Sequence, residues 1–318
     1  MLLLFFVPLI ILSIGVVQSG WMVFLLYLVS GLGMTGIGMG VMHDALHGSY
    51  SQNKWVNKVL GYSINIIGAN ASVWKIQHNV LHHTYTNIEG SDDDINMPFF
   101  LRFSPNTKHH RVHKYQHFYV WFFYGFLTLI WVTAKDFVRI NRYKKIGYFK
   151  KKHDVFKELA KTILWKVIYY SYSLVIPIIM LPVSPWLVVG AFLFMHFFTG
   201  MFISVVFQTA HVMPSSEFPN PDEKGMMPDE WSVHQLVTTS NYAPRSKVFS
   251  WFIGGLNFQI EHHLLPHVCH VHYKQLSKIV LEKAEKYGIP YNTKPTFWDA
   301  ICDHFRMMRA LGQNTVAV

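Results

Sequence analysis

The chain has 318 residues, of which 51% are hydrophobic, 16% aromatic and only 14% charged. Soluble domains usually carry about 25% charged residues, so this composition excludes an ordinary soluble protein and predicts an integral membrane protein. The net charge of +10 does not indicate nucleic acid as a partner, because ten Lys and Arg residues lie together between Lys135 and Lys161. A basic stretch of this kind suits the headgroups of membrane lipids better.

Two uncharged apolar segments, at about 2–17 and 21–42, open the chain. Each approaches the ~20 residues that cross a bilayer as a helix. The first is not read as a cleaved signal peptide, because no Lys or Arg precedes it and a second span follows at once. Whether a polar leader precedes the first segment stays open. GLGMTG at 31–36 matches the GxGxxG pattern of dinucleotide sites but lies inside the second span, so we interpret its glycines as allowing close helix packing.

The first two histidine motifs follow the second span. HDALH places His43 and His47 four residues apart, so on a helix the two side chains share one face. HNVLHH repeats that spacing with His78 and His82 and adds His83 about 100° further round the helix. The extra ring can turn toward a neighbouring metal, so this motif suits two ions better than one.

Two interrupted apolar segments, 56–74 and 118–133, are expected to lie in or dip into the membrane interface. If the second segment crossed, the basic stretch at 135–161 would lie outside, against the positive-inside rule. The histidines between these segments have i, i+4 spacing but lie in a basic, polar region, so we expect no metal at His109, His113 and His117.

Two further spans are predicted at about 163–181 and 186–209, the first interrupted only by Lys166. The turns at 18–20 and 182–185 carry no charge, so both are expected to face outward. The prediction is one membrane domain over residues 1–318, with both termini cytoplasmic and cytoplasmic parts at about 43–162 and 210–318.

A third histidine group comes from the end of the fourth span and the following tail. His211 ends FQTAH, and NFQIEHHLLPH supplies His262 and His263. All the motifs then emerge on the cytoplasmic side. Neutral imidazoles with few carboxylates favour iron, copper or zinc, and eight of them overfill one site but serve two. The candidate metal ligands are His43, His47, His78, His82, His83, His211, His262 and His263.

The remaining histidines and both cysteines are not expected to bind metal. His196 precedes His211 by fifteen residues, or ~22 Å along a helix, too far to share its ion, so we interpret it as a buried polar residue. Cys269 and Cys302 indicate neither a disulfide framework nor a cysteine-based site. The other predicted non-ligands are His234, His267, His270 and His272.

HDALH, HNVLHH and QIEHH resemble the three histidine boxes of membrane fatty acid desaturases. The likeness extends over nearly the whole chain, including WSVHQLVTTSNY (231–242) and WFIGGLNFQIEHHLLP (251–266). The third box opens with a glutamine, and in this the chain resembles the front-end branch of the family. That branch includes delta-6, delta-5 and linoleoyl-CoA desaturases. That branch inserts a double bond between an existing one and the carboxyl end. The resemblance implies an all-α membrane fold with a cytoplasmic helical cap and two iron ions held by the eight histidines.

The same resemblance suggests residues that support the ligands. Gln259 stands where other branches have a ninth histidine, and whether it is a weak ligand or a hydrogen-bond donor near the metal stays open. Four carboxylates could fix imidazole tautomers by accepting an N–H: Asp44, Asp92, Asp94 and Glu261. For the Asp92–Asp94 stretch, a solvated loop is an equal alternative.

The implied reaction uses O₂ and inserts a cis double bond into a fatty acyl-CoA or acyl-lipid. The sequence has no haem-binding HPGG motif like that of fused cytochrome b5 domains, so we expect a separate electron donor, either a cytochrome b5 or a ferredoxin. Lys75, Arg245 and Lys247 could meet an acidic donor or a coenzyme A phosphate, or serve only solubility. We expect the bacterial inner membrane rather than the endoplasmic reticulum, membrane lipids as neighbours and no nucleic acid.

Two alternatives belong to other classes. A di-iron hydroxylase would use the same boxes, and only the product separates it from a desaturase. A metal transporter would place ionisable groups at mid-membrane, but the spans hold little beyond Lys166 and His196. Neither the bond that is attacked nor the oligomeric state follows from the sequence.

Overall fold

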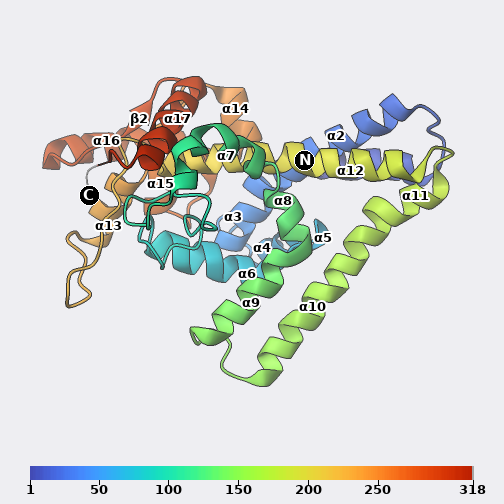
Figure 1. Cartoon of the computed structure of the whole chain (residues 1–318), viewed down its shortest axis with the longest axis horizontal. Coiled ribbons are helices and arrows are strands. Elements are labelled where there is room, and N and C mark those ends of the chain that lie inside the picture. Colours follow the sequence, from blue (N-terminus) through green and yellow to red (C-terminus); the bar gives the residue numbers. More distant parts are fainter. Residues whose placement is uncertain (317–318) are drawn as a thin grey trace. The chain divides into compact units, whose positions relative to one another are not determined.

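The computed structural model describes residues 1–316, and its regular secondary structure is almost entirely helical (Figure 1). Two two-residue strands, β1 Asn241–Tyr242 and β2 Thr293–Lys294, pair in parallel. The chain forms two compact units. The first contains residues 1–76 and 122–204, and the second contains residues 77–121 and the chain from 205 onward. The predicted all-α fold is confirmed.

The first unit carries most of the apolar helices. Its elements are α1 Leu2–Ser13, α2 Gly20–Gly36, the π-helical η1 Ile37–Val41, α3 Met42–His47, α4 Lys54–Gly61, α5 Ser63–Ile66, α6 Ala71–Lys75, α8 Leu127–Ile130, the π-helical η4 Trp131–Lys135, α9 Asp136–Lys145, α10 Lys152–Tyr170, the π-helical η5 Ser171–Val175 and α11 Ile176–Met180. Helix α12, Pro185–His211, begins in this unit and ends in the second.

Three continuous helices within residues 1–316 are long and apolar enough to cross a membrane: Gly20–His47, Lys152–Met180 and Pro185–His211. They correspond to the second, third and fourth predicted spans. A fourth would exist only if the bent pair 111–124 and 127–145, which contains the predicted interfacial segment 118–133, formed one broken span. The prediction of four spans is therefore not confirmed.

The predicted first span is shorter than expected. Helix α1 has 12 residues and ends at Ser13, so it is about 18 Å long, against ~30 Å of hydrocarbon. The chain turns at Gly15, whose φ is +76°, a conformation that glycine adopts readily. Phe5 and Leu12 are fully buried in the apolar core of the first unit. Packing within the unit, rather than the length of the apolar run, determines where this helix ends.

The glycines of GLGMTG lie at close helix contacts, which confirms their predicted packing role. A Cβ on Gly33 would overlap backbone atoms of Leu4 and Phe5 in α1, and a Cβ on Gly31 would meet Thr199 of α12. The side chains of Ser30 and Thr199 reinforce these contacts by donating to the carbonyl oxygens of Phe5 and Gly31. The motif brings backbones together and has no strand before it.

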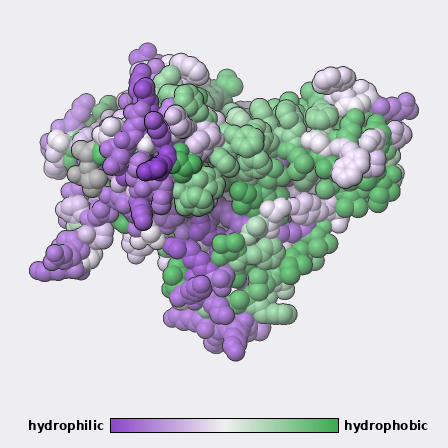
Figure 2. Space-filling model, in the orientation of Figure 1, coloured by the Kyte–Doolittle hydropathy of each residue, from purple (hydrophilic) through white to green (hydrophobic). Residues whose placement is uncertain are grey.

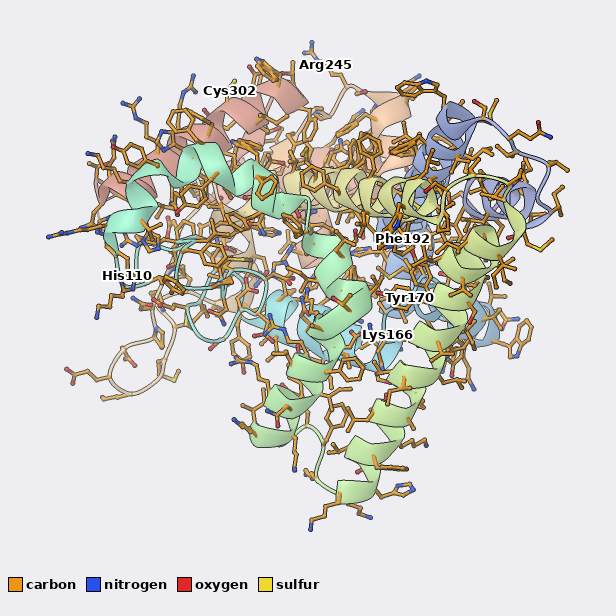
Figure 3. The ribbon with its side chains drawn as sticks, turned by 45° about the vertical axis from the view of Figure 1, so that its right-hand side comes forward. His110, Lys166, Tyr170, Phe192, Arg245 and Cys302 are labelled. Atoms are coloured by element: carbon orange, nitrogen blue, oxygen red, sulfur yellow. The ribbon has the colours of Figure 1, made fainter. Side chains whose placement is uncertain are left out.

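The lysine inside the third predicted span, Lys166, which projects from α10 (Figure 3), is buried and paired. Lys166 Nζ lies 2.9 Å from Asp136 Oδ2, and it also donates to the carbonyl oxygens of Gly68 and Trp131. A buried charge is tolerated when it is paired and hydrogen-bonded in this way. Lys166 therefore joins α10 to the start of α9 and to the loop before α6.

The turn between α9 and α10 is the hydrophilic tip of this pair of helices, whereas the end of α10, from Thr162 onward, is largely apolar (Figure 2). Five lysines on this tip are exposed: Lys144, Lys145, Lys150, Lys151 and Lys152. Exposed Ile146 and Tyr148 lie between them in sequence. Basic and apolar side chains together at the start of a candidate span suit a membrane interface.

The second unit holds the shorter polar helices. Its elements are the π-helical η2 Ile76–His82, whose first residue belongs to the first unit, the 3₁₀ helix η3 Arg111–Tyr115, α7 Gln116–Tyr124, which ends across the unit boundary, α13 Trp231–Thr238, α14 Lys247–Phe252, α15 Gln259–Leu264, the 3₁₀ helix η6 His270–His272, α16 Tyr273–Tyr287 and α17 Phe297–Gln313. A core of Leu236, Ile260 and Ala284 joins α13, α15 and α16. The strand pair aligns Asn241 with Thr293.

Candidate metal centre

The first box lies in the first unit, on α3. His43 and His47 lie on one face, as predicted, with ring centroids 4.7 Å apart, and both rings pack edge-on against Trp74. Asp44 Oδ1 lies 3.7 Å from His43 Nδ1. Helix α3 ends at His47, and the next residue, Gly48, caps it with a φ of +79° directly after the box.

The second box lies in the second unit, with His78 and His82 on the π-helix η2 and His83 directly after it. Wider turns of this kind often occur at functional sites. The rings of His78 and His82 stack with centroids 5.2 Å apart, and His83 projects nearly at right angles to both. His78 Nε2 and His83 Nε2 lie 3.3 Å apart.

Asp92 fixes one ring of this box. His82 Nδ1 lies 3.1 Å from each carboxylate oxygen of Asp92, so the Nδ1–H donates to the carboxylate and Nε2 points elsewhere. Burial alone would lower the pKa of His82, but the charge and hydrogen bond of Asp92 outweigh it and raise that pKa. Asp92 also accepts from the backbone N–H groups of Asn87 and Asp94, which orders the loop after the box.

Asp94 lies near the same box. Its Oδ2 is 3.7 Å from the Nδ1 atoms of His78 and His82, while its Oδ1 accepts from Gln77 Nε2. Asp92 and Asp93 are both buried. Of the two interpretations of this acidic stretch, the structure therefore favours support of the histidines over a solvated loop.

Three imidazoles from distant parts of the chain converge in the second unit. His82 comes from η2, His211 from the end of α12 and His263 from α15, and their ring centroids lie 4.7 to 4.9 Å apart. One nitrogen of each lies within 4.8 Å of the others. We call this the three-histidine cluster. His262 stacks on His78 and lies beside His83.

The three-histidine cluster fits a transition metal. Its members are buried, and His82 Nε2 and His263 Nε2 have no hydrogen-bond partner. Burial and the neighbouring imidazoles hold the pKa of His263 well below its usual range, so this ring stays neutral with a lone pair to donate. Buried polar atoms are normally hydrogen-bonded, so unpaired imidazole nitrogens this close together form a group that could hold a metal ion.

Gln259 lies close to the three-histidine cluster. Its side chain is fully buried, neither of its polar atoms makes a regular hydrogen bond, and the amide interacts with the ring of His211. A buried unsatisfied amide is costly, so this position also fits a ligand of the metal or of its bound water.

The contacts of Glu261 differ from the predicted contact with an imidazole. Its two oxygens accept hydrogen bonds from Asn241 Nδ2 at 2.8 Å and Tyr291 Oη at 2.9 Å, rather than from an imidazole. Asn241 Oδ1 in turn accepts from the backbone N–H of Ile260. Burial raises the pKa of Glu261 to about 7, against the opposing effect of these two hydrogen bonds. Glu261 therefore fixes the backbone of the third box.

The third-box rings have partners that the sequence did not indicate. His263 Nδ1 lies 2.9 Å from Gln235 Oε1, and His262 Nδ1 lies 3.1 Å from Tyr273 Oη. Gln235 falls within WSVHQLVTTSNY, but nothing in its spacing relates it to the third box. Its role follows only from the packing of α13 against α15.

Other histidines that were predicted not to bind metal have ordinary partners. His196 lies 2.7 Å from Tyr169 Oη and 3.1 Å from Thr128 Oγ1, so it is a buried polar residue as predicted. His109, His113 and His234 each have Nε2 at 2.8 Å from a backbone carbonyl oxygen. Cys269 and Cys302 form no disulfide.

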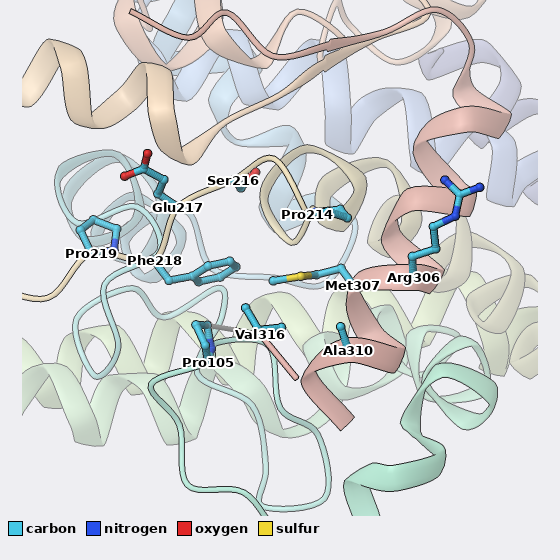
Figure 4. A pocket seen from close by; sticks show the side chains of 10 residues that line it. All are labelled: Pro105, Pro214, Ser216, Glu217, Phe218, Pro219, Arg306, Met307, Ala310 and Val316. Atoms are coloured by element: carbon cyan, nitrogen blue, oxygen red, sulfur yellow. The ribbon is translucent and has the colours of Figure 1, made fainter. Parts of the chain in front are cut away.

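A cavity of about 600 Å³ in the second unit is separate from the candidate ligands. Phe218 and Met307 point toward one another in it, and Arg306 and Glu217 lie at its edge (Figure 4). None of its ten lining residues is a histidine. It is therefore not part of the metal centre.

Comparison with known proteins agrees with these motifs. The fatty acid desaturase family model matches residues 19–295. An sn-1 linoleoyl-lipid 6-desaturase of Synechocystis sp. is 35% identical over 289 residues, covering 90% of this chain and 79% of the relative. The enzyme of the same name from Arthrospira platensis is 35% identical over 92% of this chain and 79% of its own length. An acyl-lipid (8-3)-desaturase of Physcomitrium patens is 34% identical over 87% of this chain and 58% of the relative. The chain belongs to the fatty acid desaturase family.

Proposed function

We propose that this desaturase inserts a cis double bond at carbon 6 of a linoleoyl chain carried by a membrane lipid. The two relatives with the highest identity given above are named for that reaction, and they cover most of this chain. The third box begins with glutamine at Gln259, as in the front-end branch. An acyl-lipid is favoured over an acyl-CoA because all three of the relatives described act on acyl-lipids by name.

We propose that two iron ions are held by the eight box histidines, His43, His47, His78, His82, His83, His211, His262 and His263. The observation that carries this proposal is the buried three-histidine cluster with its unpaired nitrogens. For His43 and His47 the support is their i, i+4 spacing and their box. Bound iron would supply, with O₂ and two electrons, the oxidising power to remove hydrogen from an unactivated methylene, which no side chain can provide.

The protein's own groups would prepare and protect this site. Asp92 holds the Nδ1 proton of His82, which leaves Nε2 as the donor atom. Burial of His82, His211 and His263 would keep bulk water from the site and so protect a strongly oxidising centre from side reactions. The apolar tail of the substrate would run among the apolar helices, and its headgroup would stay at the interface.

We propose that the site and both termini face the cytoplasm of a bacterial inner membrane. The basic tip between α9 and α10 supports this side, because Lys and Arg stay in the cytoplasm. A separate acidic protein, a cytochrome b5 or a ferredoxin, would deliver electrons. Lys75, Arg245 and Lys247 are candidates for its docking, and Lys247 is exposed on α14.

Product analysis tests this function. The chain is expressed in a host without polyunsaturated fats, fed linoleate, and double bonds are located by mass spectrometry. We expect a new cis bond at carbon 6 in the lipid fraction, absent with His262→Ala and present with His109→Ala, whose ring donates to a backbone carbonyl away from the boxes. A bond at another carbon would correct the position, and a hydroxylated product would indicate the hydroxylase instead. Parallel assays with acyl-CoA and preformed lipid identify the carrier.

A further inference from the structure

Two members of the three-histidine cluster are supported by chemically different partners. His82 donates its Nδ1–H to the carboxylate of Asp92, with both N–O distances 3.1 Å. His263 Nδ1 instead lies 2.9 Å from the amide oxygen of Gln235. Each partner can accept the Nδ1 proton, so in each ring Nε2 is the nitrogen left to face a metal. One supporting partner is anionic and the other is neutral.

Burial and a second hydrogen bond hold the side chain of Gln235 in position for this contact. It is fully buried on α13, and its Oε1 also lies 2.9 Å from Thr86 Oγ1. The Thr86 hydroxyl lies 2.7 Å from the backbone carbonyl of His82 and 3.3 Å from His263 Nδ1. Gln235 and Thr86 therefore connect the backbone of the second box to a ring of the third box.

The other third-box ring has the same kind of support. His262 Nδ1 lies 3.1 Å from Tyr273 Oη, and Tyr273 is buried at the start of α16. A phenol, like an amide, is an uncharged acceptor. Both rings of the third box thus have neutral partners, whereas carboxylates lie beside the second box.

We propose that Gln235 is a positioning residue of the metal centre, which selects the His263 tautomer with Nε2 unprotonated and keeps that ligand a weaker electron donor than His82. This inference rests on the proposed iron centre. A carboxylate that accepts the N–H of an imidazole makes the ring more electron-rich, whereas a neutral amide orients it without adding charge. The neutral partner would hold the iron at a higher reduction potential than a carboxylate at the same position.

Three variants separate this role from a purely structural one. Gln235→Leu removes the acceptor at similar size, and Gln235→Glu keeps an acceptor but adds charge. Gln116→Leu is the matched control, because Gln116 is equally buried in the second unit but bonds only to the backbone of Arg102 and Met308. Iron per folded chain, iron affinity and the midpoint potential of the bound iron are measured on each purified protein, with folding checked by circular dichroism.

We expect Gln235→Leu to lower iron affinity roughly 10- to 100-fold, while Gln116→Leu keeps wild-type iron affinity in its folded fraction. We expect Gln235→Glu to keep iron but to lower its midpoint potential. If Gln235→Leu does not fold, the midpoint potential of the iron bound to Gln235→Glu tests the inference by itself. Wild-type iron affinity in folded Gln235→Leu, or an unchanged potential in Gln235→Glu, would overturn the inference. A wild-type protein that binds no iron would instead overturn the proposed function.

Discussion

His82 Nδ1 lies 3.1 Å from each carboxylate oxygen of Asp92, and both residues are buried. Because the same carboxylate accepts from the backbone of Asn87 and Asp94, the position of the ring and the path of the following loop depend on one side chain. This contact is the clearest link between the polypeptide and the orientation of a candidate metal ligand.

Asp92→Asn should therefore weaken metal binding more than it weakens the fold. An amide can present its NH₂ group to His82 Nδ1 and select the wrong tautomer, so we expect a loss in iron affinity of roughly 10- to 100-fold. Metal analysis of the purified variant measures this. Asp222→Asn is the control, since Asp222 accepts only local backbone N–H groups in an exposed loop. Equal iron content in both variants would refute the role of Asp92.

Gly33→Ala should separate α1 from α2. The added Cβ would overlap the backbone of Leu4 and Phe5, which cannot rotate away, so we expect a loss of about 1–3 kcal/mol in the free energy of unfolding. Denaturation in detergent measures the change. Gly190→Ala in α12 is the control, because its Cβ would meet only Phe24, at 3.9 Å. Similar stability of the two variants would argue against the close contact.

Lys166→Met should be strongly destabilising, because it leaves the Asp136 carboxylate buried without its cation. Breaking a buried pair on one side costs about 3–5 kcal/mol, whereas replacing both partners by apolar groups is often much less costly. We therefore expect Lys166→Met combined with Asp136→Leu to recover part of the loss. A double-mutant cycle of unfolding free energies in detergent tests this, and strictly additive losses would contradict it.

His304 should make the second unit less stable in acid. Burial lowers the pKa of His304 to about 4, against the opposing effect of its bond to the Val212 carbonyl, while the unfolded value is near 6.5. Between these values the unfolded chain binds more protons than the folded one, so stability falls as pH decreases from 6.5 toward 4. The contribution is about 3 kcal/mol at most. His304→Gln should show a shallower pH dependence of stability, and an unchanged slope would exclude this histidine as the cause.

The sequence indicated the candidate metal ligands more directly than the residues that hold those ligands in place. The i, i+4 spacing of His78 and His82 places two rings on one helix face whatever the rest of the fold does. Gln235 could not be predicted in the same way, because it lies 28 residues from His263 and meets that ring only through packing of one helix on another. Glu261 was predicted to contact an imidazole because of its place in the box, but its side chain contacts Asn241 and Tyr291 instead.

For the helices too, local sequence patterns were predictive, whereas contacts between distant parts of the chain were not. Apolar length correctly predicted the helices Gly20–His47 and Pro185–His211, because a long uncharged run has few alternatives to a continuous helix. The length of the apolar run did not predict the end of α1, which stops at Ser13 before the left-handed turn at Gly15. The buried position of Lys166 likewise depends on Asp136, 30 residues away, which no local pattern relates to it.

Metal analysis of the purified wild-type protein tests the central claim most directly, with His263→Ala and His109→Ala measured beside it. We expect two irons per chain in the wild type and in His109→Ala, and fewer in His263→Ala, because His263 belongs to the three-histidine cluster and His109 does not. Iron-free protein that converts linoleate, or equal metal content in the two variants, would contradict the proposed centre.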